Sequence, residues 1–341
     1  MANSTEKSQD DVSLVVVLLD VNPYFWGRRS IESAASGSSA LTFNQFMQNV
    51  VLFINSILLL NNLNEAVVIA FGTRTCGFVF NSNLEKTQNE KQNVSPSSRL
   101  LKQVEEFLNK EDVLPTPAES NTVNESSLLS GALSLSLCYI QRTLKAGPSH
   151  PQPRILCLQC KSDAPQQYVA VMNAVFSAQR SMIPIDTCIV GNEHSAFLQQ
   201  AAHITGGIYM KPSLPEGILQ YLTVVFATDL HSRRFLQLPR PAGVDFRASC
   251  FCHKKTIDMG FVCSVCLSIF CKKHSSCSTC GPSLQSQLRP HTSLYLVLVR
   301  YITTIPTIHH ENWIFLVACE IHHEYSNDLE DDSELTLINF L

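Results

Sequence analysis

Continuous apolar runs alternate with segments of helical periodicity over most of the first 230 residues of this chain. The run at 13–19 (SLVVVLL) ends at Asp20, and the runs at 65–71 and 154–160 are equally continuous. Such runs are typical of parallel strands that are buried on both faces. Their alternation with helices of ten to twenty residues predicts βαβ crossovers. We therefore expect an α/β fold, in which a mostly parallel sheet is flanked by helices.

The other predicted elements follow from the same patterns. Helices are expected at 43–60, at 126–144 with Ser126 or Ser127 as the cap, and at 165–181, 197–204 and 215–226. Short strands are expected at 76–80, where the strand forms a hairpin, and at 183–190 and 208–210. Polar, Ser-rich composition predicts a loop at 28–39 and a loop-like insertion at 81–121, with one weak helix at 98–108.

Composition changes divide the chain into four parts. Residues 12–228 are predicted to form the α/β domain, 229–243 a linker and 244–285 a cysteine-rich domain, while 286–341 form an atypical tail, expected to be poorly ordered. The apolar runs in the tail are far shorter than the ~20 residues that a membrane-spanning helix needs.

The overall composition favours a packed, intracellular protein. Hydrophobic residues make up 45% of the chain and charged residues 16%, which supports a sizeable core. The net charge of -4 argues against a protein whose main task is to grip nucleic-acid phosphates. No basic segment followed by an apolar one opens the sequence, so we expect the thirteen cysteines to be thiols or metal ligands.

Two pairs of cysteines have the spacing of zinc knuckles. Cys263 and Cys266 form one C-x2-C pair, and Cys277 and Cys280 form the second. Each pair can present two thiolates to one ion, and two pairs complete a tetrahedron. The sequence therefore predicts a main zinc site at these four residues, and such a site is structural because no coordination position is open. The alternative is four buried free thiols.

A second set of ligand-type residues surrounds the knuckles. Cys250, Cys252, His253 and Cys271 can form a second zinc site in a RING-like cross-brace, with His274 as a further candidate ligand. The Cys-x-Cys spacing is less usual than C-x2-C, and the third pair has only one certain member. Otherwise these residues form the packed edge of the finger.

Several segments together resemble one known family. They are VVLLDVNPYFWG, SGALSLSLCYIQR and TGGIYM, followed by DFRASCFCHKK and GFVCSVCLSIFC in the cysteine-rich part. This pattern resembles subunit 3 of the general transcription and DNA-repair factor TFIIH, a family that joins a von Willebrand A domain to a C-terminal zinc finger. The resemblance covers residues 12–281, and the tail departs from it.

The resemblance implies a function as well as a Rossmann-like von Willebrand A fold. It implies a nuclear, non-catalytic scaffold subunit that contacts other TFIIH core subunits, especially a second von Willebrand A subunit with a RING. In that role it supports helicase-driven DNA opening in RNA polymerase II initiation and nucleotide excision repair. It implies zinc as cofactor, only indirect contact with nucleic acid, and neither a membrane nor a small-molecule substrate.

The resemblance also places a metal-adhesion motif, Asp-x-Ser-x-Ser, after the first strand. Asp20 matches its first residue, whereas Asn22 and Tyr24 stand in place of the serines. Ser126 or Ser127 and Asp163 are candidate outer ligands for Mg²⁺, which prefers an octahedron of oxygens. The competing interpretation is that Asp20 and Asp163 are solvated loop ends that cap helices.

Enzymatic functions find little support in the sequence. Its glycines form no phosphate-binding loop, and no Ser-His-Asp set stands out. His203, Cys138, Cys157 and Cys188 lie in apolar contexts that predict core positions. The alternative function is a RING-type ubiquitin ligase, which requires two zinc ions and a complete cross-brace. Four lysines beside the finger (Lys254, Lys255, Lys272 and Lys273) are interpreted as a solvated surface rather than a nucleic-acid contact.

Overall fold

The computed structural model divides the chain into two units, Met1–Val244 and Asp245–Leu341, and each is described by itself. In the first unit the structure describes residues 12–36, 41–83, 96–113, 126–146, 151–161 and 163–239. In the second unit it describes residues 250–253, 257, 259–262, 268–272, 277–278 and 295–298.

The first unit is built on a six-stranded sheet with the order β3-β2-β1-β4-β5-β6. Its strands are β1 (Ser13–Asp20), β2 (Glu65–Phe71), β3 (Cys76–Asn81), β4 (Gln152–Gln159), β5 (Ile185–Ile189) and β6 (Tyr209–Met210). All neighbours pair in parallel except β3, which forms an antiparallel hairpin with β2. The predicted mostly parallel sheet and its hairpin are confirmed.

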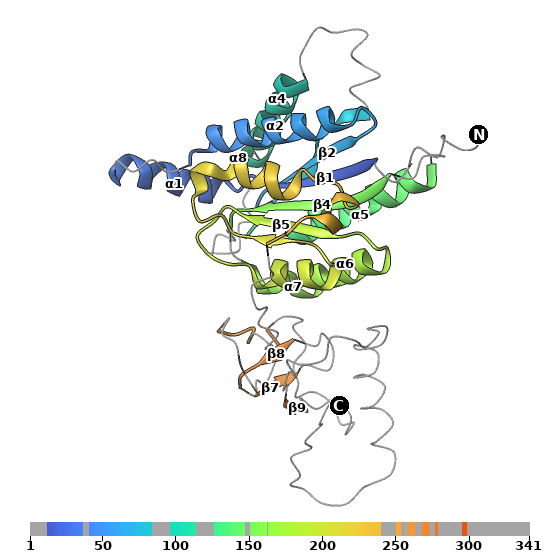
Figure 1. Cartoon of the computed structure of the whole chain (residues 1–341). Helices are drawn as coiled ribbons and strands as arrows, with labels where there is room; N and C mark the ends of the chain where they lie inside the picture. Colours follow the sequence, from blue (N-terminus) through green and yellow to red (C-terminus); the bar gives the residue numbers. More distant parts are fainter. Residues whose placement is uncertain are drawn as a thin grey trace, which may run out of the picture. The chain divides into compact units, whose positions relative to one another are not determined.

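Helices cover both faces of this sheet (Figure 1). One face carries α2 (Phe43–Leu60), α4 (Pro96–Val113) and α8 (Ile218–Tyr221), which continues into a π-helical turn at Leu222–Phe226. The other face carries α5 (Leu129–Ala146), α6 (Tyr168–Arg180) and α7 (Ala196–Thr205). Because strand side chains alternate, Val15, Val17 and Leu19 of β1 face the first layer, and Leu14, Val16 and Leu18 face the second.

Helix α2 shows how local sequence fixes an element of the core. Thr42 accepts a hydrogen bond from the Gln45 backbone, and the Gln45 side chain accepts one from Thr42, which completes a capping box. The helix is long and apolar enough to cross a membrane by length and composition alone. Its inward residues, including Phe46, Phe53 and Ile57, are buried against the sheet, as is typical of a core helix.

The loop predicted at 28–39 is wrong for the part that the structure describes. Helix α1 spans Pro23–Ser36, and the Asn22 side chain caps it by accepting hydrogen bonds from the backbone N–H groups of Tyr24 and Phe25. Proline suits the first helical position, and Trp26 stacks on Phe46 in the core. Capping and one buried aromatic therefore outweigh the Ser-rich composition on which the prediction rested.

The helix within the insertion is longer than predicted and belongs to the core. It spans Pro96–Val113 rather than 98–108, and Leu100 and Val104 are buried against the sheet layer. Near its end, the Glu111 carboxylate accepts hydrogen bonds from Thr73 and the Arg74 backbone in the β2–β3 turn. Residues 84–95 and 114–121 of the predicted insertion lie outside the described residues.

A buried ion pair fixes the segment after the last helix. Arg233, in the 3₁₀ turn Ser232–Phe235, donates to both carboxylate oxygens of Asp186 on β5 at 2.9 and 2.5 Å. Arg154 of β4 donates to the carbonyls of Ala227 and Thr228. The first residues of the predicted 229–243 linker are therefore bound to the first unit.

The second unit contains a three-stranded antiparallel sheet with the order β8-β7-β9. Its strands are β7 (Met259–Val262), β8 (Ile269–Phe270) and β9 (Tyr295–Leu298). Phe270 and Cys277 are buried, and Phe251 packs against them. Strand β9 belongs to the predicted tail, whose other residues lie outside the described ones.

Candidate metal centre and acidic corner

Four side chains of the second unit converge on one point. The ligand atoms of Cys250, Cys252, His253 and Cys271 all lie within 4.8 Å of one another. The sulfurs of Cys252 and Cys271 are 3.5 Å apart, and Nδ1 of His253 lies 3.2 Å from the Cys271 sulfur. A backbone hydrogen bond joins the segment 250–253 to the strand that precedes Cys271. The Phe251 N–H donates to the carbonyl of Ile269, the first residue of β8.

The chemistry of this cluster suits a soft or borderline metal ion. Three thiols and one imidazole make a four-ligand set of the kind that binds zinc tetrahedrally. Tetrahedral geometry with Zn–S bonds of about 2.3 Å separates two sulfurs by about 3.8 Å. The Cys252–Cys271 distance is close to that value, whereas Cys250 and Cys252, with sulfurs 2.6 Å apart, must move apart by about 1 Å when an ion binds. The group can therefore bind a metal.

The surroundings of Cys250 favour its thiolate, the form that binds metals. Burial opposes the charge, but hydrogen bonds from Cys252, the Cys271 backbone and His253 lower the pKa of Cys250 to about 6. Desolvation and the neighbouring Cys252 and Cys250 sulfurs raise the pKa of Cys271 to about 11. Cys250 is thus ready to ionise before Cys271.

The predicted main site is only partly visible. Cys277 is buried against Phe270, whereas Cys263, Cys266 and Cys280 lie outside the described residues, as does His274. The main site at these four cysteines stays a prediction.

In the first unit, Asp20 ends β1 at the carboxyl edge of the sheet and is fully buried. Its Oδ1 accepts hydrogen bonds from Ser127 Oγ at 2.8 Å and from the Asn22 N–H at 3.2 Å. Its Oδ2 accepts from the N–H groups of Cys160 at 3.0 Å and Lys161 at 3.2 Å. Both carboxylate oxygens therefore already have two protein donors each.

Asn22 and Tyr24 do not extend Asp20 into a cation site. The Asn22 Oδ1 caps α1, and its Nδ2 donates to Ser127 Oγ at 3.0 Å. Tyr24 lies in the first turn of α1 and is about one third exposed. Burial raises the pKa of Asp20, against the hydrogen bonds that lower it. Its oxygens therefore serve the fold, and the solvated loop end that the sequence suggested for Asp20 is wrong.

Asp163 does have the capping role that the sequence suggested. Its carboxylate accepts hydrogen bonds from Ser195 Oγ at 2.5 Å and from the Phe197 N–H at 3.0 Å, at the start of α7. Burial raises the pKa of Asp163 above its ordinary value, although the same hydrogen bonds act in the opposite direction. Ser195 Oγ in turn accepts a hydrogen bond from the Leu198 N–H and so caps α7. Ser162 lies outside the described residues.

The predicted roles of the isolated cysteines are confirmed in part. Cys157 and Cys188 are buried core residues, and burial raises the pKa of both thiols. Cys138 is exposed on α5 and His203 is exposed on α7, so the prediction of a core position is wrong for both residues. Of the four lysines beside the finger, Lys272 is described and exposed, and the other three lie outside the described residues.

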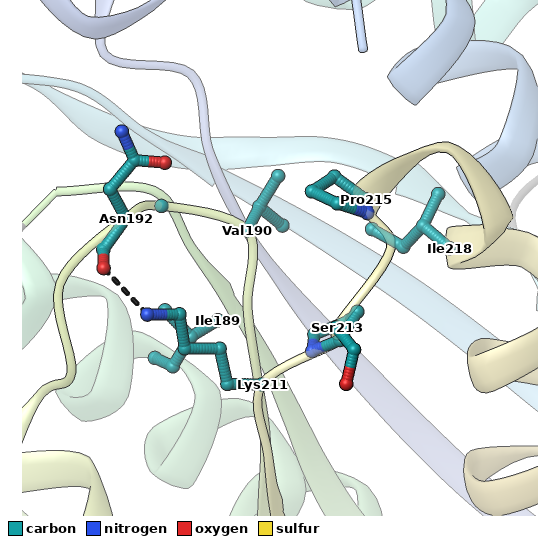
Figure 2. Close-up of a pocket in the computed structure, with 9 residues that line it drawn as sticks. Ile189, Val190, Asn192, Lys211, Ser213, Pro215 and Ile218 are labelled. Atoms are coloured by element: carbon teal, nitrogen blue, oxygen red, sulfur yellow. Dashed lines mark hydrogen bonds between the residues drawn. The ribbon is translucent and has the colours of Figure 1, made fainter. Parts of the chain in front are cut away.

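Sequence reasoning missed a cavity of about 340 Å³ after β5 (Figure 2). It is lined on one side by Val190 and Asn192 and on the other by Lys211, Ser213 and Pro215. The Lys211 ammonium closes one side by donating to the Asn192 carbonyl at 2.5 Å. The position after β5 is the signal that was available, because ligands of open α/β sheets often bind at the carboxyl ends of strands.

The sequence matches the family described as Transcription factor Tfb4 over residues 12–281. The chain belongs to the Tfb4 family. It is 53% identical over 285 residues to the general transcription and DNA repair factor IIH subunit TFB4 of Arabidopsis thaliana, covering 82% of this chain and 91% of the relative. It is 36% identical over 342 residues to the general transcription factor IIH subunit 3 of Dictyostelium discoideum, with the same coverage of 82% and 91%.

A solved structure supports the same assignment for the first unit. The crystal structure of the TFIIH p34 N-terminal domain aligns with a TM-score of 0.52 and 27% identity, covering 64% of this chain and 99% of that one. The von Willebrand A-type fold and the TFIIH resemblance predicted from the sequence are thus confirmed. As a Tfb4-family member the protein is a component of TFIIH, acts in transcription and interacts with other TFIIH components.

The Tfb4 match includes the whole candidate metal centre. All four clustered residues and the four predicted main-site cysteines lie within residues 12–281. The match stops before β9 and the rest of the 286–341 tail. The candidate metal centre therefore lies within the part of the chain that matches the family, and the tail lies outside it.

Proposed function

We propose that this Tfb4-family protein is a non-catalytic scaffold of the TFIIH core in the nucleus. Through protein–protein contacts it supports helicase-driven DNA opening in RNA polymerase II transcription initiation and nucleotide excision repair. Its principal partner is the second von Willebrand A subunit, which carries a RING. The nucleic acid is reached through the complex rather than directly.

One observation carries the non-catalytic part of this proposal. Asp20 stands where a von Willebrand A domain would hold its cation, yet its two oxygens accept four hydrogen bonds from within the domain. A carboxylate that is fully engaged in this way ties β1 to the β4 edge and to Ser127. It supports a domain that presents surfaces to other proteins, rather than one that binds a ligand through a metal.

We further propose zinc as the metal of the second unit. One ion is held by Cys250, Cys252, His253 and Cys271, and a second by Cys263, Cys266, Cys277 and Cys280. Zinc would supply the folding free energy that a small unit with few buried residues lacks. With four protein ligands at each site, neither ion has an open position for catalysis.

Zinc stoichiometry tests the two sites separately. The full chain is expected to contain two zinc ions, and either Cys250→Ser or Cys263→Ser should reduce the content to one. Cys138→Ser is the matched control, because Cys138 is an exposed thiol of the first unit, and it should leave both ions in place. Elemental analysis of the purified proteins measures the ratio, and an unchanged content in Cys250→Ser would refute the site that the structure displays.

Reconstitution tests the scaffold function. The chain is co-expressed with the remaining TFIIH core subunits, and the purified complex is assayed for promoter opening and for incision of damaged DNA. We expect stoichiometric incorporation, and loss of both activities when the chain is omitted. A chain that fails to join the complex, or that transfers ubiquitin with a conjugating enzyme, would contradict the proposal. The comparisons with relatives give the ubiquitin-ligase alternative no support.

A further inference from the structure

Large exposed apolar side chains lie in three connections at the edge of the first unit where the parallel strands begin, opposite Asp20. We call them the amino-edge patch. Its members, with their exposed fractions, are Leu59 (83%), Leu60 (67%), Leu63 (66%), Met182 (86%), Phe235 (78%) and Leu236 (47%). Exposed apolar residues are ordinary when scattered, but a group at one edge of a domain marks an interaction site.

Connectivity places every member at this edge. Leu59 and Leu60 end α2, and Leu63 lies just before β2 begins at Glu65. Met182 lies between the end of α6 and the start of β5. Phe235 and Leu236 follow Arg233, whose guanidinium binds Asp186 near the start of β5.

The patch is held rigidly in its exposed position. Asn64 donates to the carbonyl of Ile57 and accepts from the Ser13 N–H, which fixes the turn that carries Leu63. Met182 has a φ of 55°, a left-handed conformation that costs free energy for a non-glycine residue. Its N–H and that of Ser181 still bond to the last carbonyls of α6. Pre-organised apolar anchors of this kind lose little entropy when a partner binds.

The charges around the patch have one dominant sign. Lys145 ends α5, Arg180 ends α6 and Arg234 precedes Phe235, and all three are exposed. Two carboxylates lie nearby: Asp229 accepts a hydrogen bond from the Ser232 N–H, and Glu65, which begins β2 two residues after Leu63, is partly buried. In addition, no charged residue occurs between Leu41 and Asn64, so the outer side of α2 is neutral throughout. An apolar centre with a basic rim complements an apolar segment that has acidic flanks.

We infer that the amino-edge patch docks an apolar segment with acidic flanks from another TFIIH core subunit. The inference rests on the proposed function, because it names the surface through which the scaffold contacts that subunit. Phe235 and Met182 are the central anchors, and the basic rim steers the acidic flanks. The opposite edge of the sheet, where Asp20 is buried and hydrogen-bonded, takes no part in this docking.

Paired variants test the patch in the complete chain. Met182→Asp combined with Phe235→Asp should weaken binding to the co-expressed remaining core subunits by about tenfold or more, as expected for loss of anchor residues. The matched control, Ile31→Asp combined with Leu214→Asp, alters residues of similar exposure (72% and 69%) that lie on α1 and on the β6–α8 connection. The control should bind as the wild type does, and equal binding by both pairs overturns the inference.

Two further measurements identify the occupant and protect against a folding artefact. All four residues are exposed, so the thermal midpoints of both paired variants should match that of the wild type. A photoreactive residue in place of Leu63, within the reconstituted core, should crosslink to a different subunit. Crosslinking to residues 286–341 of the same chain, or to a second copy, overturns the assigned occupant. Failure of the wild type itself to join the core instead refutes the proposed function, and the inference with it.

Discussion

At the scale of single residues, Asp20 shows how a buried carboxylate is kept at a strand end. Burial raises its pKa from the ordinary value of 3.8, and four hydrogen bonds oppose that rise. The folded state consequently keeps a proton on Asp20 at pH values where the unfolded chain has lost it. The stability contributed by this proton is present below pH 3.8 and is lost as pH rises through the folded-state pKa.

Asp20→Asn tests this balance. The new amide places an N–H group against the N–H donors of Cys160 and Lys161, so we expect the free energy of unfolding to fall by about 1–3 kcal/mol. The difference from the wild type should be larger at acidic pH and should narrow as pH rises, because only the wild type loses its proton. Urea unfolding at several pH values measures both effects. Glu193→Gln, an exposed control, should show neither, and a gap that widens with pH would contradict the pKa assignment.

Sequence alone located Asp20 correctly and misjudged its surroundings. A continuous apolar run that ends at a carboxylate predicts the end of a buried parallel strand, and β1 ends there. The resemblance placed Ser126 or Ser127 near Asp20, but the backbone donors at Cys160 and Lys161 could not be predicted, because they are more than one hundred residues away along the chain. The cap formed by Asn22 is local, and it was missed because the Ser-rich composition of 28–39 was given more weight than Asn22 followed by Pro23.

At the scale of elements, the most informative contact joins β5 to the segment that leaves the domain. Asp186 accepts both guanidinium bonds of Arg233 and a third bond from the Ile208 N–H before β6. Arg154 on β4 holds the end of the last helix alongside. Periodicity predicted these strands well, but it could not show that β5 fixes the polar linker through Arg233, or that β4 holds the residues just before the linker.

Removing one charge of this ion pair should lower the free energy of unfolding more than removing both charges does. Arg233→Met leaves the Asp186 carboxylate buried without its partner, and we expect a loss of about 3–5 kcal/mol in the free energy of unfolding. Adding Asp186→Asn removes the unpaired charge and should recover part of that loss. Denaturant unfolding of the two variants provides the comparison. Arg234→Met, at the exposed neighbouring position, should be neutral, and an equal loss in Arg233→Met and the double variant would contradict the ion-pair account.

At the scale of the whole molecule, the two units depend on different forces. The first unit has an extensive apolar core on both faces of its sheet. In the described part of the second unit, the buried apolar cluster contains Phe270 and Cys277, with Phe251 beside them. The core seen in these described residues is too small to hold them in a stable fold without a metal or another crosslink.

Removal of the metal by a chelator should therefore affect the second unit and leave the first unit unchanged. Prolonged treatment with a strong zinc chelator is expected to increase amide hydrogen exchange across residues 250–278 and to leave β1, β4 and β5 protected. The described part of the first unit contains no group of three potential metal ligands, so its exchange should not change. Mass spectrometry of the full chain with and without chelator measures this. If the amides of residues 250–278 stay protected from exchange after the metal has been removed, a structural role for zinc is contradicted.

The cysteine spacing was a good guide to chemistry and a weaker guide to which site is visible. Paired C-x2-C knuckles predicted the main site, which lies largely outside the described residues. The described residues instead bring together the second set, Cys250, Cys252, His253 and Cys271. In this set the Cys250 sulfur accepts a hydrogen bond from the backbone N–H of Cys271, 21 residues later in the chain. The sequence had named these four residues as a possible second site but left open a packed edge instead, and the pairing of β7 with β8 accompanies their convergence in the structure.

The double use of the Asn22 amide has a consequence for how this domain can change over evolutionary time. One end of the amide starts α1 and the other holds the hydroxyl that binds Asp20. Replacing Asn22 with serine, as an adhesion-type motif would require, would supply a hydroxyl that can cap α1 but would remove the amide N–H that donates to Ser127. Tyr24 would still stand in place of the second serine. A single substitution therefore does not turn this corner into a cation site.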